Sequence, residues 1–234
     1  MQTVRQAQTI ARAVSHPYSQ TFALGFTGWV HPYRGEARLA EQSADAAISL
    51  STDHGFPLWL GWGRITKGRA LAELGKPEQG IDLIYQGLSV LQSTESELQL
   101  TFFLAMLGQT QQEMGRIQQA LVTVDDALKR VGKTAERYFE PELYRLRGEL
   151  LLDSGDAYVA DARTCFERAI DVAGKQSAKS WELRATRSLA RLLEKQSRRN
   201  EAREMLAQIY NWFSEGFDTA DLKNAKALLN ELTV

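Results

Sequence analysis

The sequence predicts an all-α protein in which antiparallel pairs of helices repeat in tandem and stack into a right-handed α-α superhelix. Two series of glycines carry this prediction, because neighbouring members of each series are 40 residues apart. They are Gly28, Gly68, Gly108 and Gly148, and Gly35, Gly75, Gly115 and Gly155. A period of about 20 to 50 residues is typical of solenoids, in which each unit buries its apolar face only against its neighbours.

Further small residues follow the same step. One series is Ala40, Gly80 and Ala120, and another is Ala47, Gly87 and Ala127. Helices approach most closely where side chains are small, so these positions indicate where the two helices of a pair cross. A small residue in helix A, a turn glycine and two small residues in helix B form the pattern of tetratricopeptide repeats. Their commonest length is about 34 residues, and HEAT repeats of about 40 residues are the alternative.

The chain divides into a half repeat, five helical hairpins and a capping helix, which we expect to form one solenoid domain over residues 1–234. Residues 1–15 match the second helix of a repeat whose first helix is missing. The hairpins cover residues 19–53, 57–93, 98–131, 141–173 and 180–213, and the capping helix covers residues 218–232. We therefore expect the chain to be the C-terminal part of a longer protein, with a purpose-built N-terminal cap as the alternative.

Departures from the repeat fall at the ends of helices. Pro32 should end its helix early, because a proline inside a helix removes a hydrogen bond. The turn at Gly155 is two residues longer than the others, and Ser197 takes the place of the turn glycine in the last hairpin. Asp218 and Asp221, three residues apart, predict the start of the capping helix.

Composition excludes several functional classes. The formal charge of −1, from 28 basic and 29 acidic side chains, provides no overall field that attracts nucleic acid or a membrane surface. No run approaches the roughly 18 apolar residues that span a bilayer, and no signal-peptide pattern is present. The one cysteine, Cys165, cannot form an intramolecular disulfide, and we expect a buried structural thiol. These features predict a soluble, cytoplasmic protein.

No group of residues predicts catalysis. Residues 127–134 fit only a loose form of the phosphate-binding loop, and they end a predicted helix instead of joining a strand to a helix. The histidines, His16, His31 and His54, lack the spacing of a metal site, and no GxSxG stretch is present. We therefore predict no enzyme activity, no metal and no cofactor for this chain.

The concave face is the candidate binding surface, because the first helix of each tetratricopeptide pair lines it. The register places on it Phe22, Trp29, Trp62, Arg69, Phe102, Gln109, Arg145, Glu149, Arg184, Arg187 and Arg191. Its N-terminal end is aromatic, and its C-terminal end carries a row of arginines that would bind carboxylate or phosphate groups. The alternatives are packing of the aromatic residues between repeats and neutralisation of the arginines by Glu182 and Glu194.

Several segments resemble one family. They are HPYSQTFAL at His16–Leu24, HGFPLWLGWG at His54–Gly63, ERYFEPELYRLRGELLL at Glu136–Leu152, KSWELRATRSLARL at Lys179–Leu192 and WFSEGFDTADLKNAKALL at Trp212–Leu229. These segments resemble the C-terminal tetratricopeptide-repeat region of bacterial proteins in which a class III adenylate or guanylate cyclase domain precedes a STAND-type ATPase.

The resemblance implies that any catalysis lies upstream and that this region is a sensor or scaffold in signal transduction. It would bind a protein or peptide partner, or the upstream domains of the same polypeptide, and neither nucleic acid nor a membrane. The alternative function is the small-molecule inducer-sensing domain of a helical-repeat transcription activator.

Overall fold

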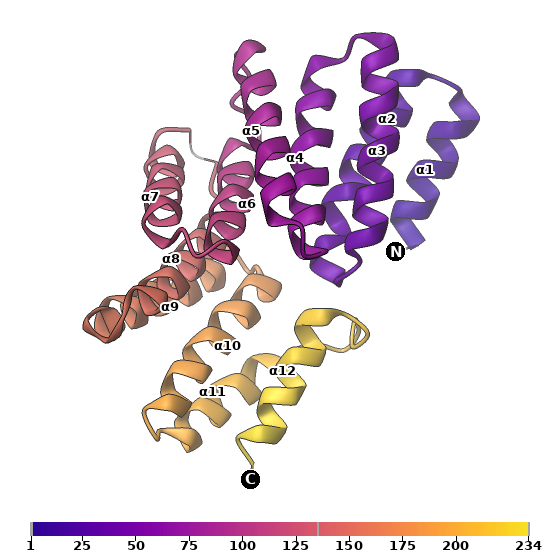
Figure 1. Ribbon diagram of the computed structural model, residues 1–234. Coiled ribbons are helices and arrows are strands. Elements are labelled where there is room, and N and C mark those ends of the chain that lie inside the picture. The colour runs from indigo at the N-terminus through magenta and orange to yellow at the C-terminus, as the bar shows by residue number, and fades with distance from the viewer. Residues whose placement is uncertain (1, 135, 234) are drawn as a thin grey trace. The chain divides into compact units, whose positions relative to one another are not determined.

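The computed structural model describes residues 2–134 and 136–233, and every regular element within these ranges is a helix (Figure 1). The chain forms two compact units, residues 1–114 and 115–234. The first contains α1 (Gln2–Val14), α2 (Pro17–Val30), α3 (Ala37–His54), α4 (Pro57–Glu73), α5 (Pro77–Ser93) and α6 (Leu100–Glu113). The second contains α7 (Ile117–Thr134), α8 (Glu140–Ser154), α9 (Val159–Lys175), α10 (Lys179–Lys195), α11 (Arg199–Tyr210) and α12 (Ala220–Glu231).

These helices confirm the predicted all-α class with its repeated hairpins, half repeat and terminal helix. The boundary between the units lies at the turn after α6, so the third predicted hairpin contributes one helix to each unit. Residues 127–134, the loose match to a phosphate-binding loop, lie entirely within α7. None of the helices in the described ranges is long and apolar enough to cross a membrane.

Three of the four turn glycines share one backbone conformation, whereas Gly155, in the longer turn, has φ of 124°. Gly35, Gly75 and Gly115 have φ angles of 72°, 82° and 70°, in the left-handed region that glycine enters without steric cost. Ser197 adopts the same conformation with φ of 62° in the last hairpin. α2 ends at Val30, and Pro32 begins a short 3₁₀ turn (Pro32–Arg34), as its ring requires.

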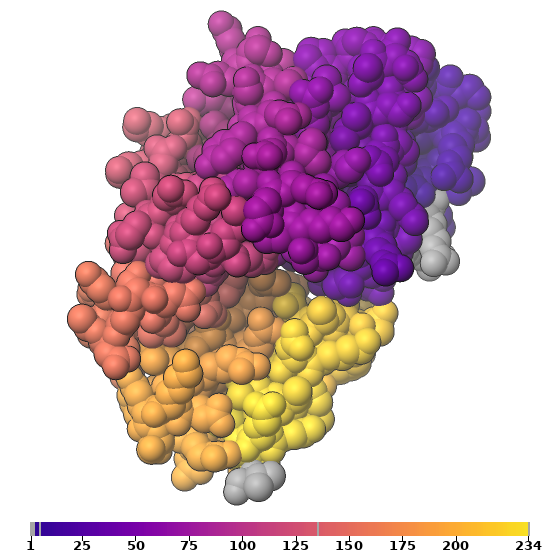
Figure 2. Space-filling view, in the orientation of Figure 1, coloured from indigo at the N-terminus to yellow at the C-terminus, as the bar shows by residue number. Residues whose placement is uncertain are grey.

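Small residues allow the helices of the N-terminal unit to touch through their backbones, and α4 and α5 pack most closely. A Cβ atom on Gly68 would lie 2.4 Å from the carbonyl oxygen of Gly80, and a Cβ atom on Gly80 would lie 2.4 Å from that of Gly68. Gly28 and Gly148 also face neighbouring helices, where a Cβ atom would meet Thr66 and Phe166 respectively. In Figure 2 the atoms of successive helices of this unit meet across its visible face.

The C-terminal unit has a core of its own. The fully buried side chains include Phe166, Leu183, Leu193 and Leu206, and α12 adds Leu222, Ala225 and Leu228. α12 packs against α10 and α11 through these residues. The packing fixes the first turn of α12 close to the exposed side of α10, where the arginine row lies.

Candidate functional site

The predicted aromatic residues of the N-terminal unit pack against one another on α2, α4 and α6. Trp29 lies 5.4 Å from Phe102 between ring centroids, and Trp62 lies 5.1 Å from Phe103, both edge to face. This geometry is the one that aromatic pairs prefer. Trp62 and Phe102 are buried, whereas Phe22 is half exposed at the edge of the cluster. The contacts of this cluster are those of a packed core.

Trp59, which the register did not select, lies at the centre of this cluster. Its ring lies 5.3 Å from Phe22 and 5.0 Å from Trp62 between centroids. The repeat gave no signal for it, because Ser19 precedes it by 40 residues and Gln99 follows it by 40. A cavity of about 330 Å³ lies beside it, lined also by Tyr18, Phe56, Leu58 and Thr94.

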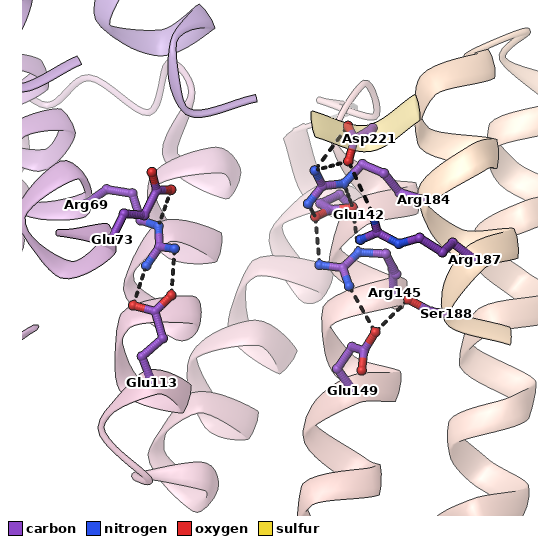
Figure 3. Close-up of polar contacts among 10 residues, drawn as sticks. All are labelled: Arg69, Glu73, Glu113, Glu142, Arg145, Glu149, Arg184, Arg187, Ser188 and Asp221. Atoms are coloured by element: carbon purple, nitrogen blue, oxygen red, sulfur yellow. Dashed lines mark hydrogen bonds and ion pairs between the residues drawn. The ribbon is translucent and has the colours of Figure 1, made fainter. Parts of the chain in front are cut away.

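The predicted polar residues of this unit link α4 to α6. Arg69 is buried on α4, and its two terminal nitrogens bind the carboxylate of Glu113 at 2.8 and 2.7 Å. The Nε atom of Arg69 also lies 3.3 Å from Glu73 (Figure 3). Gln109 is half-buried on α6. Arg69 is thus satisfied by two internal carboxylates.

The charged residues of the C-terminal unit form a network centred on Glu142, a residue of α8 with 1% exposure. Arg145 binds both oxygens of its carboxylate, at 2.8 and 2.9 Å. Arg184 of α10 binds the same two oxygens at 3.2 and 2.7 Å (Figure 3). Burial alone would raise the pKa of Glu142, but the charges and hydrogen bonds of Arg145 and Arg184 outweigh it and lower that pKa to about 2.

Two further carboxylates complete this network. Asp221, in the first turn of α12, accepts hydrogen bonds from Arg184 at 3.1 and 3.3 Å. Glu149 accepts a hydrogen bond from Arg145 at 3.2 Å and one from the hydroxyl of Ser188 at 2.5 Å. Arg145 and Arg184 are therefore each held by two carboxylates, which offset the cost of removing most of their contact with water.

The other two arginines of the row are less well compensated. Arg187 makes one ion pair, 3.8 Å from Asp221, and no hydrogen bond to the described residues. Burial lowers the pKa of Arg187, and the nearby charges of Arg184, Arg145 and Arg191 lower it further against the opposing effect of Asp221. Arg191 is exposed on α10, with no ion pair to the described part of the chain.

The repeat explains how these helices come to hold complementary charges. With the two-residue insertion at Gly155, equivalent positions in α8 and α10 are 42 residues apart. Glu142 is thus equivalent to Arg184, Arg145 to Arg187, and Glu149 to Arg191. Of these equivalent pairs, Glu142 and Arg184 have opposite charges and form an ion pair between α8 and α10, whereas Arg145 and Arg187 carry the same charge. The sequence offered Glu182 and Glu194 as alternative partners that would neutralise the arginines, but Glu182 binds Lys179 instead.

Asp221 has a different role from the one that the sequence predicts. The sequence predicts a helix start at this position, and α12 does begin at Ala220. The carboxylate of Asp221, however, binds Arg184 of α10, and the hydroxyl of Thr219 donates to the carbonyl oxygen of Gly216 at 2.7 Å. No group of three or more histidine, cysteine or acidic side chains in the described residues is arranged to hold a metal ion.

Comparison with known proteins identifies the architecture. No protein-family model matches the chain. An uncharacterized protein of Rhizobium meliloti (strain 1021) is 28% identical over 183 residues, which are 76% of this chain and 17% of that protein. The chain therefore spans about a sixth of the length of this relative.

Three solved structures share the fold at low sequence identity. A kinesin light chain of Podosopora anserina with nearly identical tetratricopeptide-like repeats has a TM-score of 0.58 and 16% identity, over 83% of this chain and 94% of that one. NprR in complex with its cognate peptide has a TM-score of 0.67 and 11% identity, over 98% of this chain and 64% of the NprR chain. A STAND protein with a tetratricopeptide repeat sensor from Pyrococcus horikoshii has a TM-score of 0.59 and 13% identity, over 98% of this chain and 34% of the STAND protein chain. The chain therefore has a tetratricopeptide-like helical-repeat fold, which fits a module for protein interactions.

Proposed function

We propose that this chain is a non-catalytic interaction module, the sensor or scaffold of a larger signalling protein whose cyclase or ATPase domains precede it. The fold, the peptide held by NprR and the sensor role of the repeats in the STAND protein support an interaction role. The length of the Rhizobium relative supports a place within a longer polypeptide. Catalysis would then belong to the preceding domains, and this chain would bind a protein or peptide and transmit that event.

An apolar groove on the N-terminal unit is the observation that carries this proposal. A cavity of about 400 Å³ lies between α1 and α2, lined by Ile10, Val14, Phe22 and Phe26 among others. Ile10 is 64% exposed and Val14 is 61% exposed. Large apolar side chains gathered in one exposed groove are typical of an interaction surface.

The repeat register supports a helix as the occupant of this groove. Ala7 of α1 is exposed, whereas its counterparts at the 40-residue step are buried: Ala47, Gly87 and Ala127. Gly87 owes its burial to the first helix of its own pair, since a Cβ atom there would lie 2.7 Å from the carbonyl oxygen of Gly61. The occupant that matches α1 is therefore a helix of the same kind, with small residues facing Ala7, supplied by the preceding part of a longer polypeptide.

Complex formation with that preceding segment tests the proposal. The segment encoded immediately before Met1 would be expressed separately, mixed with this chain and analysed by size-exclusion chromatography. We expect a complex with the unaltered chain and none with the Ile10→Asp, Val14→Asp double variant, whose helical circular dichroism should be unchanged because both side chains are exposed. Val122, which is also exposed, on α7, provides the control substitution Val122→Asp. The proposal would be contradicted if the preceding segment does not bind this chain, or if no such segment is encoded in the same reading frame.

Inducer sensing is the second candidate function, favoured by the cavity of about 330 Å³ beside Trp59. Tyr18 and Phe56 line this cavity together with Trp59 and offer aromatic faces there. A small apolar molecule would suit this site. Thermal-shift screening with a metabolite library tests this function, and stabilisation that disappears in Trp59→Phe would favour it over the first proposal.

A further inference from the structure

We propose that Arg187 and Arg191 of α10 bind the carboxylates of an acidic peptide segment, and that Asp221 occupies part of this site when no peptide is bound. The inference rests on the proposed interaction role and specifies the chemistry of the partner. It also gives α12 a second role, because its first turn supplies the internal carboxylate (Figure 3).

The charges around α10 do not balance. Four guanidinium groups gather there, from Arg145, Arg184, Arg187 and Arg191, beside the three carboxylates of Glu142, Glu149 and Asp221. The carboxylates are used mainly by Arg145 and Arg184, which both bind Glu142 through two hydrogen bonds. The uncompensated positive charge therefore lies at Arg187 and Arg191.

Arg187 is the residue that most needs a further anion. Its side chain is 18% exposed, so it has lost most of its contact with water while its ion pair with Asp221 measures 3.8 Å. Burial is the main cause of its lowered pKa, and the three like charges nearby lower that pKa further against the effect of Asp221. A carboxylate bound to the exposed part of this guanidinium would supply the missing hydrogen bonds, which are strong when both groups are charged.

The spacing of the two arginines favours a peptide over a single small anion. Arg187 and Arg191 are four residues apart on one helix, so their Cβ atoms lie about 5–6 Å apart. Alternate side chains of an extended peptide point to the same side at a distance of about 7 Å. Two acidic residues separated by one residue would therefore reach both arginines at once. The two-hydrogen-bond contact of Arg184 with Glu142 demonstrates that carboxylates suit the guanidinium groups of this site.

Asp221 is placed where it would compete with such a peptide. Its carboxylate lies between Arg184 and Arg187, and the chain before it, residues 211–219, contains no regular helix. The apolar side chains of Leu222, Ala225 and Leu228 anchor α12, so the carboxylate is not needed to hold the helix in place. A peptide carboxylate would take over the contact to Arg187 and leave the rest of α12 where it is.

Fluorescence anisotropy with a fluorescein-labelled hexaglutamate peptide tests this inference on the full chain. We expect binding at 50 mM salt and none to hexaglutamine, because a formal charge of −1 gives the protein no general attraction for anions. Arg187→Gln and Arg191→Gln should each weaken binding about tenfold or more, the effect of removing one charged hydrogen-bonding group. Asp221→Asn should strengthen it about threefold to tenfold by removing the competing charge. Arg203→Gln, an exposed arginine on α11, should change nothing.

Each measurement has a result that overturns the inference. Equal affinity of hexaglutamate for the wild type and the Arg191→Gln variant would refute it, and this variant keeps its fold because the side chain is exposed. If the Asp221→Asn variant binds hexaglutamate more weakly than the wild type, Asp221 does not compete with the peptide. Displacement of the peptide by micromolar inorganic phosphate would assign the site to phosphate and refute the assignment to carboxylate. If the preceding segment binds the α1 groove while hexaglutamate does not bind, this inference fails and the proposed function stands.

Discussion

The contact between α4 and α5 predicts that one added methyl group will destabilise the protein. In Gly68→Ala, the new Cβ atom would lie 2.4 Å from the carbonyl oxygen of Gly80 and 2.8 Å from the side chain of Ile84. Ordinary contact begins near 3.4 Å, so relief of the clash requires about 1.0 Å of movement (3.4 − 2.4). The oxygen belongs to the backbone of α5, and no rotation of a side chain can move it. The two helices must therefore separate.

The magnitude follows from two opposing effects. Overpacking in a well-packed contact costs about 1–3 kcal/mol. Alanine in place of glycine within a helix contributes about 0.5–1 kcal/mol in the other direction, because glycine loses more backbone entropy on folding. The clash is the larger effect here, since it is backbone against backbone. We expect the free energy of unfolding to fall by about 1–2 kcal/mol.

Gly132 provides the matched control, because it lies within α7 and a Cβ atom there would meet nothing within 4 Å. Gly132→Ala should therefore raise the free energy of unfolding by about 0.5–1 kcal/mol. Urea denaturation followed by far-UV circular dichroism measures both variants, with a separate transition fitted for each unit of the chain. If Gly68→Ala is as stable as the wild type, or gains stability as Gly132→Ala should, the inferred backbone contact is wrong.

Three further predictions concern single side chains. Ser197→Gly should raise the free energy of unfolding by about 1 kcal/mol, because the left-handed conformation at φ of 62° costs a residue with a side chain about 1–2 kcal/mol; a loss of stability in urea would contradict this reasoning. The pKa of Glu142 is lowered from its ordinary value of 4.5 to about 2, so the stability it contributes is complete above pH 4.5 and is lost as the pH falls towards 2. That shift corresponds to about 3 kcal/mol, and Glu142→Gln should remove this acid dependence from urea titrations between pH 2 and 5 while lowering stability at pH 7. Cys165 is buried against Arg147, so the thiol should react with a disulfide reagent only as fast as the protein unfolds, and rapid reaction of the native protein would contradict this expectation.

The helical hairpins were predictable because the residues that repeat determine the backbone conformation locally. Glycine at the left-handed turn positions and small residues at the crossings act on the backbone directly, whatever surrounds them. Gly75, for example, forms the turn after α4, and Gly80 allows α5 to pack closely against α4. Neither effect depends on distant parts of the chain. The same logic identified Ser197 as the substitute for a turn glycine, and its φ angle bears this out.

The polar contacts were less predictable because a long charged side chain can reach several possible partners. The register placed Arg184 in one row with Arg187 and Arg191, but its partners, Glu142 and Asp221, lie 42 and 37 residues away on two different helices. Only the first of these distances belongs to the repeat. The second depends on how α12 packs after an irregular segment, which no period in the sequence describes. Arg69 and Glu113, 44 residues apart, are a second pair outside the step of 40.

One series of positions explains why the C-terminal unit suits a charged partner, whereas the groove of the N-terminal unit suits an apolar one. At the 40-residue step, with the insertion included, Phe22, Trp62 and Phe102 are followed by Glu142 and Arg184. In the N-terminal unit this series consists of rings that pack among other aromatic side chains and carry no charge. In the C-terminal unit the same positions hold buried charges, and these require fixed partners in order to be tolerated. The carboxylates that serve as fixed partners orient the arginine row. Because there is one carboxylate fewer than there are arginines, positive charge remains at Arg187 and Arg191, where we propose that an acidic peptide binds.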